Sequence, residues 1–186
     1  MGCGVSTATQ STATATQATT EPKRESTLDV LLTGRSATPT SITISLPFDV
    51  LEDLIVDETF DVEETLQKVQ TLVNSHANDI TKLFDDCRDG NTVVDCQQFV
   101  SWGSSLGADI DEDTAQNQFF GACGYPVEQG GETPQKACDV CLFACCLVRI
   151  ANLYTIQNKG NPMDSDIPNQ LRVFWDEKAL DKVASL

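Results

Sequence analysis

The stretch DVEETLQKVQTLVNSHANDITKLFD, residues 61–85, decides the fold class of this chain. Its apolar residues recur at intervals of three and four, which is the spacing of one face of an α-helix. The members of this face are Val62, Leu66, Val69, Val73, Ile80, Leu83 and Phe84. Glu63 and Glu64 lie near the start, where the helix dipole favours negative charge. The stretch therefore predicts one long amphipathic helix over residues 61–85.

The segments on either side complete an all-α prediction. Residues 41–46 alternate apolar and polar side chains, which indicates a short strand or an extended lead-in. Pro47 suits the first turn of a helix, and the apolar residues that follow it up to position 55 have helical spacing. A helix is predicted over 99–106, with Gly107 as its stop, and another from the acidic run 111–113 to about 120. After a loop over 121–135, two more helices are predicted, over 137–156 and 165–183. The predicted order is helix–loop–helix, a short link, a second helix–loop–helix, and a trailing helix.

The charge of the chain narrows its partners. The chain has 12 Lys and Arg residues and 28 Asp and Glu residues, so its net charge is −16. Nucleic acid is not expected as a partner, because binding phosphates requires a dominant basic face. The same charge repels anionic lipids, so any membrane attachment must be apolar.

The apolar segments give no sign of membrane insertion or export. No window reaches the roughly 18 consecutive apolar residues of a spanning helix. The best, 137–154, is interrupted by Asp139, Arg149 and Asn152. The N-terminus has no apolar stretch of a secretory signal, so we expect the eight cysteines to be reduced thiols.

The N-terminus supplies an apolar anchor by modification. The chain opens Met1-Gly2-Cys3-Gly4-Val5-Ser6, which fits the signal for N-myristoylation of Gly2 after removal of Met1. One myristoyl chain binds a membrane only marginally, and no basic patch is present to assist it. S-palmitoylation of Cys3 would supply the second chain. We therefore expect a peripheral, lipid-anchored protein on the cytoplasmic face of a membrane; the alternative is a chance match in a soluble chain that is never acylated.

The composition divides the chain into a tail and a body. Residues 1–40 are rich in Ser, Thr and Ala and carry almost no apolar bulk. Such a segment cannot bury enough surface to offset its ordering entropy. We expect residues 1–40 to be an acylated, flexible tether and residues 41–186 to be the helical domain.

The segment LFDDCRDGNTVVDCQQF, residues 83–99, resembles an EF-hand of the calmodulin superfamily. An EF-hand holds calcium with oxygen ligands on a loop of about 12 residues. With Val94 as the apolar eighth position, the loop runs over residues 87–98. The resemblance then implies a degenerate calcium site formed by Asp89, Asn91, Val93, Asp95 and Gln98.

The same loop departs from the EF-hand pattern at three positions. Cys87 stands where the first Asp belongs, Thr92 replaces the glycine of the sharp turn, and Gln98 replaces the bidentate Glu. Starting the loop at Asp85 recovers one carboxylate and puts Gly90 sixth, but it displaces the apolar anchor. Tight calcium binding is therefore not expected. An ordinary polar turn between helices remains the alternative interpretation.

A second unit is predicted over residues 111–154, with a connection that lacks the calcium chemistry. Its segment FACCLVRIA, residues 143–151, resembles the exiting helix of EF-hand-like modules common in ciliary and flagellar proteins. The acylated start is similar to that of flagellar-membrane and recoverin-like calcium-binding proteins. The resemblance implies paired hands that pack together, and a ciliary or flagellar membrane as one location.

The cysteines and the single histidine are the remaining candidates for reactive or metal-binding groups. Cys138, Cys141 and Cys145 would share one face of the predicted helix 137–156, and zinc would need further thiolates such as Cys123. Buried thiols that pack a helix interface are the better interpretation. His76 lies in a polar stretch and is expected to be solvated, and no catalytic motif is present, so an enzyme is not expected.

These observations predict a lipid-anchored, non-enzymatic EF-hand-like adaptor that recruits a protein partner to a cytosolic membrane surface. The partner would bind the groove between the paired units or the helix that carries Phe174 and Trp175, unless that helix fills the groove itself. The rival predictions are a calcium sensor with an acyl switch, and a cysteine-based metal or redox protein.

Overall fold

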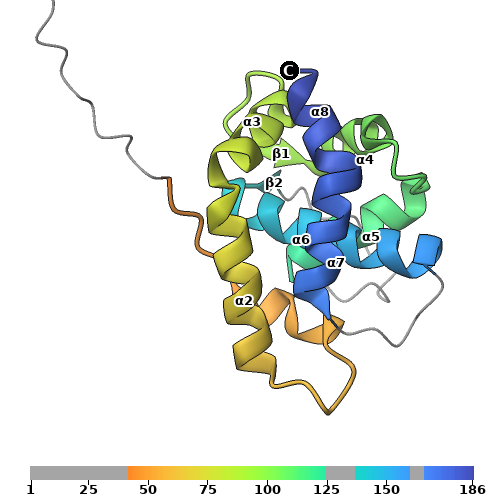
Figure 1. Cartoon of the computed structure of the whole chain (residues 1–186). Helices are drawn as coiled ribbons and strands as arrows, with labels where there is room; N and C mark the ends of the chain where they lie inside the picture. The colour runs from red at the N-terminus through yellow and green to blue at the C-terminus, as the bar shows by residue number, and fades with distance from the viewer. Residues whose placement is uncertain (1–41, 125–136, 160–165) are drawn as a thin grey trace, which may run out of the picture. The chain divides into compact units, whose positions relative to one another are not determined.

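The apolar periodicity of the chain produces a bundle of helices, seen in a computed structural model that describes residues 42–124, 137–159 and 166–186 (Figure 1). The helices are α2 (Val62–Ser75), α3 (Ala77–Arg88), α4 (Cys96–Gly103), α5 (Glu112–Ala122), α6 (Val140–Lys159), α7 (Ile167–Phe174) and α8 (Leu180–Ala184). The shorter elements are the 3₁₀ turns η1 (Phe48–Val50), η2 (Glu52–Leu54) and η3 (Ser104–Leu106), the π turn η4 (Trp175–Ala179), and the strands β1 (Val94–Asp95) and β2 (Ala137–Cys138). The all-α prediction is confirmed.

The predicted helix over 61–85 is two helices, and the prediction of one continuous helix was wrong. α2 ends and α3 begins at His76, whose φ of −111° and ψ of 15° are not helical. Two contacts accompany the break. The Ser75 hydroxyl donates to the Leu72 carbonyl at 2.6 Å, a bond that often bends helices. The His76 ring packs on Trp175 with the ring centroids 4.5 Å apart, so the break lets α2 and α3 follow the trailing helix.

The segment before α2 is extended and then turns twice. No strand forms over 42–46, where the lead-in is held by side chains of α2: the Ile44 N–H donates to Asn74 Oδ1 and the Leu46 N–H to Gln70 Oε1, both at 2.9 Å. The predicted helix after Pro47 was wrong, because the chain makes the separate 3₁₀ turns η1 and η2. The helical spacing of the apolar residues reflects turns that bury Leu51 without forming an α-helix.

Helix starts and stops follow the local signals. Asp111 caps α5 by accepting the Thr114 N–H at 2.8 Å, as the acidic run predicted. Gly107 ends η3 with a φ of 61°, a left-handed conformation that favours glycine. Short polar and glycine signals therefore place these boundaries correctly.

The loops of the two helix–loop–helix units are joined by a short antiparallel ladder. Val94 of β1 pairs with Cys138 of β2, and Asp95 pairs with Ala137. The predicted helix over 137–156 was wrong at its start, because residues 137 and 138 are a strand and the helix begins at Val140. Most of the predicted loop over 121–135 lies outside the described residues.

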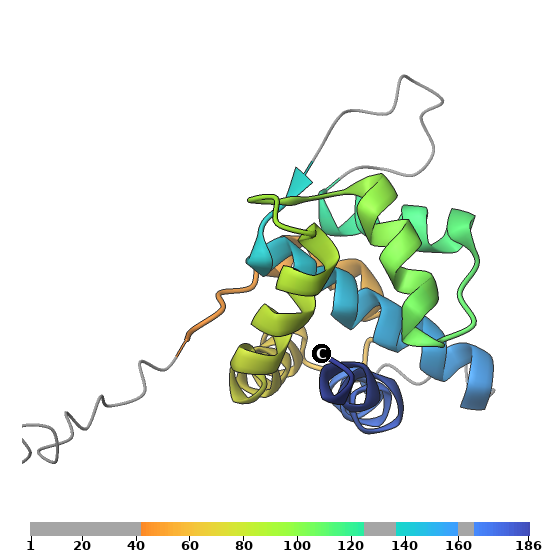
Figure 2. The same cartoon turned by 90° about the horizontal axis from the view of Figure 1, so that it is seen from above.

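α6 is the core helix of the body. All nine residues from Phe143 to Ala151 are buried, and α6 packs against α3, α5 and α7. One stretch, Val140–Asn158, is long and apolar enough to cross a membrane by composition, but 67% of the window is buried inside the fold. Such burial is what the central helix of a helical bundle requires. In Figure 2, α6 lies between α5 on one side and α2 and α7 on the other.

The trailing helix is the last layer of the bundle. It runs from Ile167 to Ala184 and widens into a π turn in the middle. α7 packs against α2 and α6, and α8 against α3, as both views show (Figures 1 and 2). The predicted helix over 165–183 is found with these bounds.

Candidate functional site

The loop between α3 and α4 is closed by its own side chains. Asp89 ends α3 in the left-handed region with a φ of 45°, and Gly90 follows with a φ of 82°. The Arg88 guanidinium donates to the Asn91 carbonyl across the loop and, through Nε, to Asp85 at 2.7 Å. A guanidinium therefore contacts the backbone oxygen of this loop.

The end of the loop is used to start a helix. Asp95 caps α4 by accepting the Gln98 N–H at 2.8 Å, and Gln98 Oε1 accepts the Asp95 N–H at 3.0 Å. This reciprocal pair is a capping box. The Gln98 amide also donates to the Arg88 carbonyl at 3.3 Å. Both residues that the resemblance assigns to the end of a calcium loop thus have oxygens engaged by backbone amides.

The remaining residues of the predicted calcium site do not form a cluster of charged ligands. Val93, whose backbone carbonyl would be the calcium ligand, has a side chain that is 38% exposed. Cys87 is buried in the last turn of α3, and burial raises the pKa of its thiol far above the ordinary 9.0. The first loop position therefore carries a neutral thiol at physiological pH. Across the described ranges, no three His, Cys, Asp or Glu side chains come together as a metal site.

The cysteines of α6 are packing residues rather than one reactive face. Cys138 lies on β2, so the prediction that it shares a helix face with Cys141 and Cys145 was wrong. Cys145 and Cys146 are fully buried, and burial raises the pKa of both thiols. Cys146 also forms a hydrogen bond with Cys138, which raises its pKa further. These thiols stay protonated and shielded from reagents.

The groove between α2, α3 and α6 is filled by the trailing helix. Phe174 is 0% exposed and Trp175 is 2% exposed, so a partner reaches either residue only if α7 leaves the body. The small apolar gap that remains beside Trp175 is lined by Leu72, Val73, His76, Ile80, Ala144, Leu147, Val148 and Leu171. His76 is half-buried here, and the expectation of a solvated histidine was wrong because a tryptophan from the trailing helix packs on its ring.

Polar contacts join the trailing helix to both units. Lys182 forms an ion pair with Asp86 at 3.0 Å, and the same carboxylate accepts the Trp102 indole N–H at 2.8 Å. On the other side, the Tyr154 hydroxyl donates to Glu177 at 2.9 Å. The helix is thus an integral part of the body in this state.

An ion pair between the buried Arg149 and the exposed Asp53, which no local sequence pattern predicts, fixes the segment before α2. Arg149 has 8% of its side chain exposed and donates to both oxygens of Asp53 at 2.7 Å, as well as to the Val50 carbonyl at 2.7 Å. Its Nε donates to Gln118 at 3.2 Å. Gly121 makes room for it, because a Cβ there would meet the guanidinium at 2.6 Å. An Arg within the most apolar run was the available signal.

The predicted lipidation sites, Gly2 and Cys3, lie outside the described residues. No protein-family model, no curated protein and no solved structure matches this chain. The family resemblance drawn from the residues therefore remains a prediction.

Proposed function

We propose that the chain is a lipid-anchored, non-enzymatic adaptor whose body is a pair of degenerate EF-hand-like units. The observation that supports this proposal most directly is the β1–β2 ladder, in which Val94 pairs with Cys138. Val94 is the apolar eighth position of the loop register derived from the sequence. The backbone hydrogen bonds of this ladder join two helix–loop–helix units through their loops.

The polar groups of the loop support a scaffold rather than a calcium sensor. Asp95 and Gln98 are occupied in the capping box, and Arg88 contacts the carbonyl of Asn91. Calcium affinity depends on the number of charged oxygens offered by the loop. A loop that begins with a buried neutral thiol and ends with an amide offers few.

The membrane role comes from the N-terminal signal. The acidic body has no means of holding an anionic bilayer by charge, so myristate on Gly2 and palmitate on Cys3 would supply the attachment. The adaptor would then hold its protein partner at the cytoplasmic face of the membrane, with ciliary and flagellar membranes as the location that the resemblance suggests.

Vesicle flotation of the full chain, acylated in a eukaryotic expression host, tests the anchor. We expect the wild-type chain to float with neutral phosphatidylcholine vesicles, and Gly2→Ala to remain in the soluble fraction because it lacks the amine acceptor. Cys3→Ser should float weakly and reversibly, since a single myristoyl chain binds marginally. Equal flotation of Gly2→Ala and the wild type would contradict the proposal.

Calcium calorimetry separates the adaptor from the calcium-sensor rival. We expect the unacylated full chain to show no micromolar calcium binding. If binding is seen, Asp89→Asn should be compared with Asp109→Asn. Each change removes one carboxylate from a residue in the left-handed region, with φ of 45° and 53°. Micromolar binding that is lost only in Asp89→Asn would favour the sensor.

A further inference from the structure

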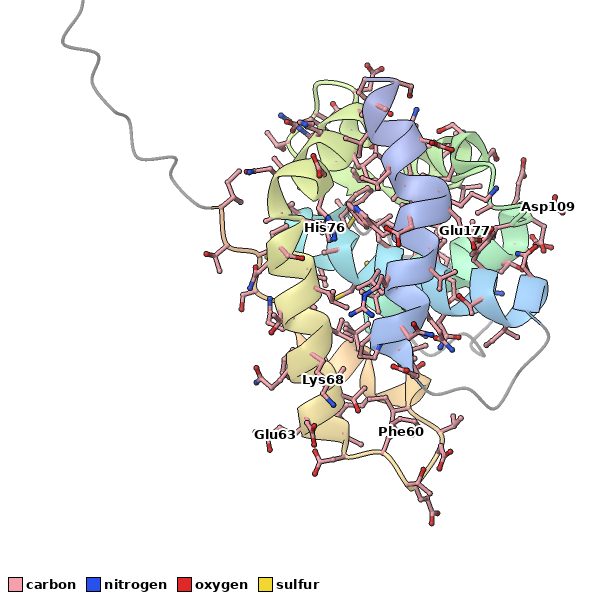
Figure 3. The ribbon with its side chains drawn as sticks, in the orientation of Figure 1. Phe60, Glu63, Lys68, His76, Asp109 and Glu177 are labelled. Carbon is pink, nitrogen blue, oxygen red and sulfur yellow. The ribbon has the colours of Figure 1, made fainter. Side chains whose placement is uncertain are left out.

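Apolar side chains are exposed at the turn between η2 and α2. Val56 is 69% exposed, Phe60 37% and Val62 39%. They are three of the seven large apolar side chains that are exposed within the described residues. We call these three residues the tip surface. Figure 3 shows Phe60 and Glu63 at the end of the body opposite the C-terminus.

The turn that carries the tip surface is held by specific contacts. Asp57 accepts the Thr59 N–H with its side chain at 2.9 Å and the Phe60 N–H with its carbonyl at 3.1 Å. Asp61 then caps α2 by accepting the Glu64 N–H at 2.8 Å. On the other side, the ion pair between Arg149 and Asp53 fixes η2. The apolar side chains are therefore presented to solvent by an ordered turn.

The tip surface lies in an acidic segment of the chain, residues 49–67, whose carboxylates we call the acidic rim. Residues 49–67 contain no Lys or Arg. They contain eight acidic residues: Asp49, Glu52, Asp53, Asp57, Glu58, Asp61, Glu63 and Glu64. Among them, Asp53 pairs with Arg149 and Glu64 pairs with Lys68. The local field adds to the net charge of −16 and favours a cationic partner.

We propose that the tip surface is the docking site for a cationic amphipathic helix of the partner protein. Apolar side chains of that helix would cover Val56 and Val62, and its Lys or Arg residues would face the acidic rim. The exposed Phe60 ring offers a face for a cation. An anionic lipid surface fits the same residues poorly, because the rim would repel it. This inference deepens the proposed adaptor role by naming the surface and the chemistry of its partner.

The test uses the unacylated full chain, so that failure of the tip surface and failure of the lipid anchor are distinguishable. The probe is a fluorescein-labelled helical peptide of about 18 residues with Leu on one face and Lys on the other. Fluorescence anisotropy should show binding that weakens steeply with added salt, as expected for charge-steered association. No binding at low salt would overturn the proposal.

Paired apolar variants locate the binding surface. Val56→Ser with Phe60→Ser should weaken binding by about tenfold or more, because the peptide loses the apolar side chains that it contacts. The control is Val93→Ser with Leu186→Ser, which changes side chains that are 38% and 54% exposed elsewhere. We expect the control to bind like the wild type. Equal affinity of both variants for the peptide would overturn the proposal, and far-ultraviolet circular dichroism would verify that each is folded.

Paired charge variants separate the rim from the net charge. Glu58→Gln with Glu63→Gln is compared with Glu112→Gln and Asp113→Asn, exposed residues at the start of α5. Both pairs remove the same charge. The control pair lies shortly after Asp109 in the sequence, and Figure 3 shows Asp109 far from Phe60. We expect only the first pair to weaken binding. An equal loss in both pairs would overturn the proposal, as would binding of the unacylated chain to phosphatidylserine vesicles that the tip variants abolish.

Discussion

At the scale of single residues, Arg149 is the most consequential buried charge among the described residues. Its guanidinium is satisfied by Asp53, the Val50 carbonyl and Gln118, from segments far apart in the sequence. Breaking such a pair leaves a buried charge without its partner, which is why both members matter. Since the Asp53 side chain is 60% exposed, part of its contribution is screened by water.

Gly121→Ala tests the close packing of the Arg149 guanidinium against this glycine. The added Cβ would lie 2.6 Å from the Arg149 guanidinium, which hydrogen bonds to Asp53, Val50 and Gln118 hold in place, so we expect a loss of about 1–3 kcal/mol in the free energy of unfolding. In an Arg149→Met background the clash is gone, and the higher helix propensity of Ala should give a gain of up to about 1 kcal/mol. Urea unfolding measures both.

The matched control for this change is Gly103→Ala in α4. Nothing lies within 4 Å of a Cβ at that position. The same substitution should therefore stabilise the fold by up to about 1 kcal/mol. If Gly121→Ala stabilised the wild-type chain as Gly103→Ala does, the described packing of Arg149 would be contradicted.

The buried thiols predict how stability changes with pH. Burial raises the pKa of Cys87, Cys145 and Cys146 above the ordinary 9.0. Below that value both the folded and the unfolded chain keep these protons, so their contribution is fully present. As the pH rises above it, the unfolded thiols ionise first and the folded state is destabilised by about 1 kcal/mol per pH unit for each thiol.

Urea midpoints at about pH 7 and about pH 10 measure this loss. Other groups also titrate in the alkaline range, so the control is Cys146→Ala. That variant should lose less stability between the two pH values than the wild type does. An identical loss would show that Cys146 does not hold its proton in the folded state.

Residue-level signals differ in how well the sequence predicts them. The Asp111 cap and the Gly107 stop depend only on near neighbours, and the sequence places both. The pairing of Arg149 with Asp53 depends on how η2 meets α6, which no local pattern encodes. Likewise, the resemblance assigns Asp95 and Gln98 to a calcium loop, whereas in the structure they form a capping box.

At the scale of elements, the mispredicted helix boundaries lie where the chain contacts segments distant in the sequence. The apolar periodicity of residues 61–85 continues through the break at His76, so the pattern alone predicts one helix. The Trp175 ring that packs there comes from the end of the chain. The start of α6 was misplaced for a similar reason, because Cys138 pairs with Val94 of the other unit.

Trp175→Ala should test whether the trailing helix is an integral layer. The side chain is 2% exposed and packs on His76, so its removal should cost about 3–5 kcal/mol in urea unfolding. Leu180→Ala, at a position 41% exposed, is the control and should cost about 1 kcal/mol or less. Similar small losses for both variants would mean that the helix detaches readily and leaves the groove open to a partner.

At the scale of the whole molecule, the proposed function links the acidic charge of the chain to its lipid anchor. The net charge of −16 repels anionic lipids, so in the proposed function an apolar modification brings the chain to a membrane. The same charge, concentrated around the tip surface, would favour a cationic protein partner. The fold class was predictable from periodicity, whereas the exposed tip surface emerged only from the packing of the turn.

The most direct test of this account is the intact mass of the N-terminal peptide of the chain isolated from its native cells. The account predicts a peptide that begins at Gly2 and carries a myristoyl group on its amine, with a thioester-linked palmitoyl group on Cys3 that hydroxylamine removes. A peptide with a free amine at Gly2 and an unmodified Cys3 thiol would contradict it.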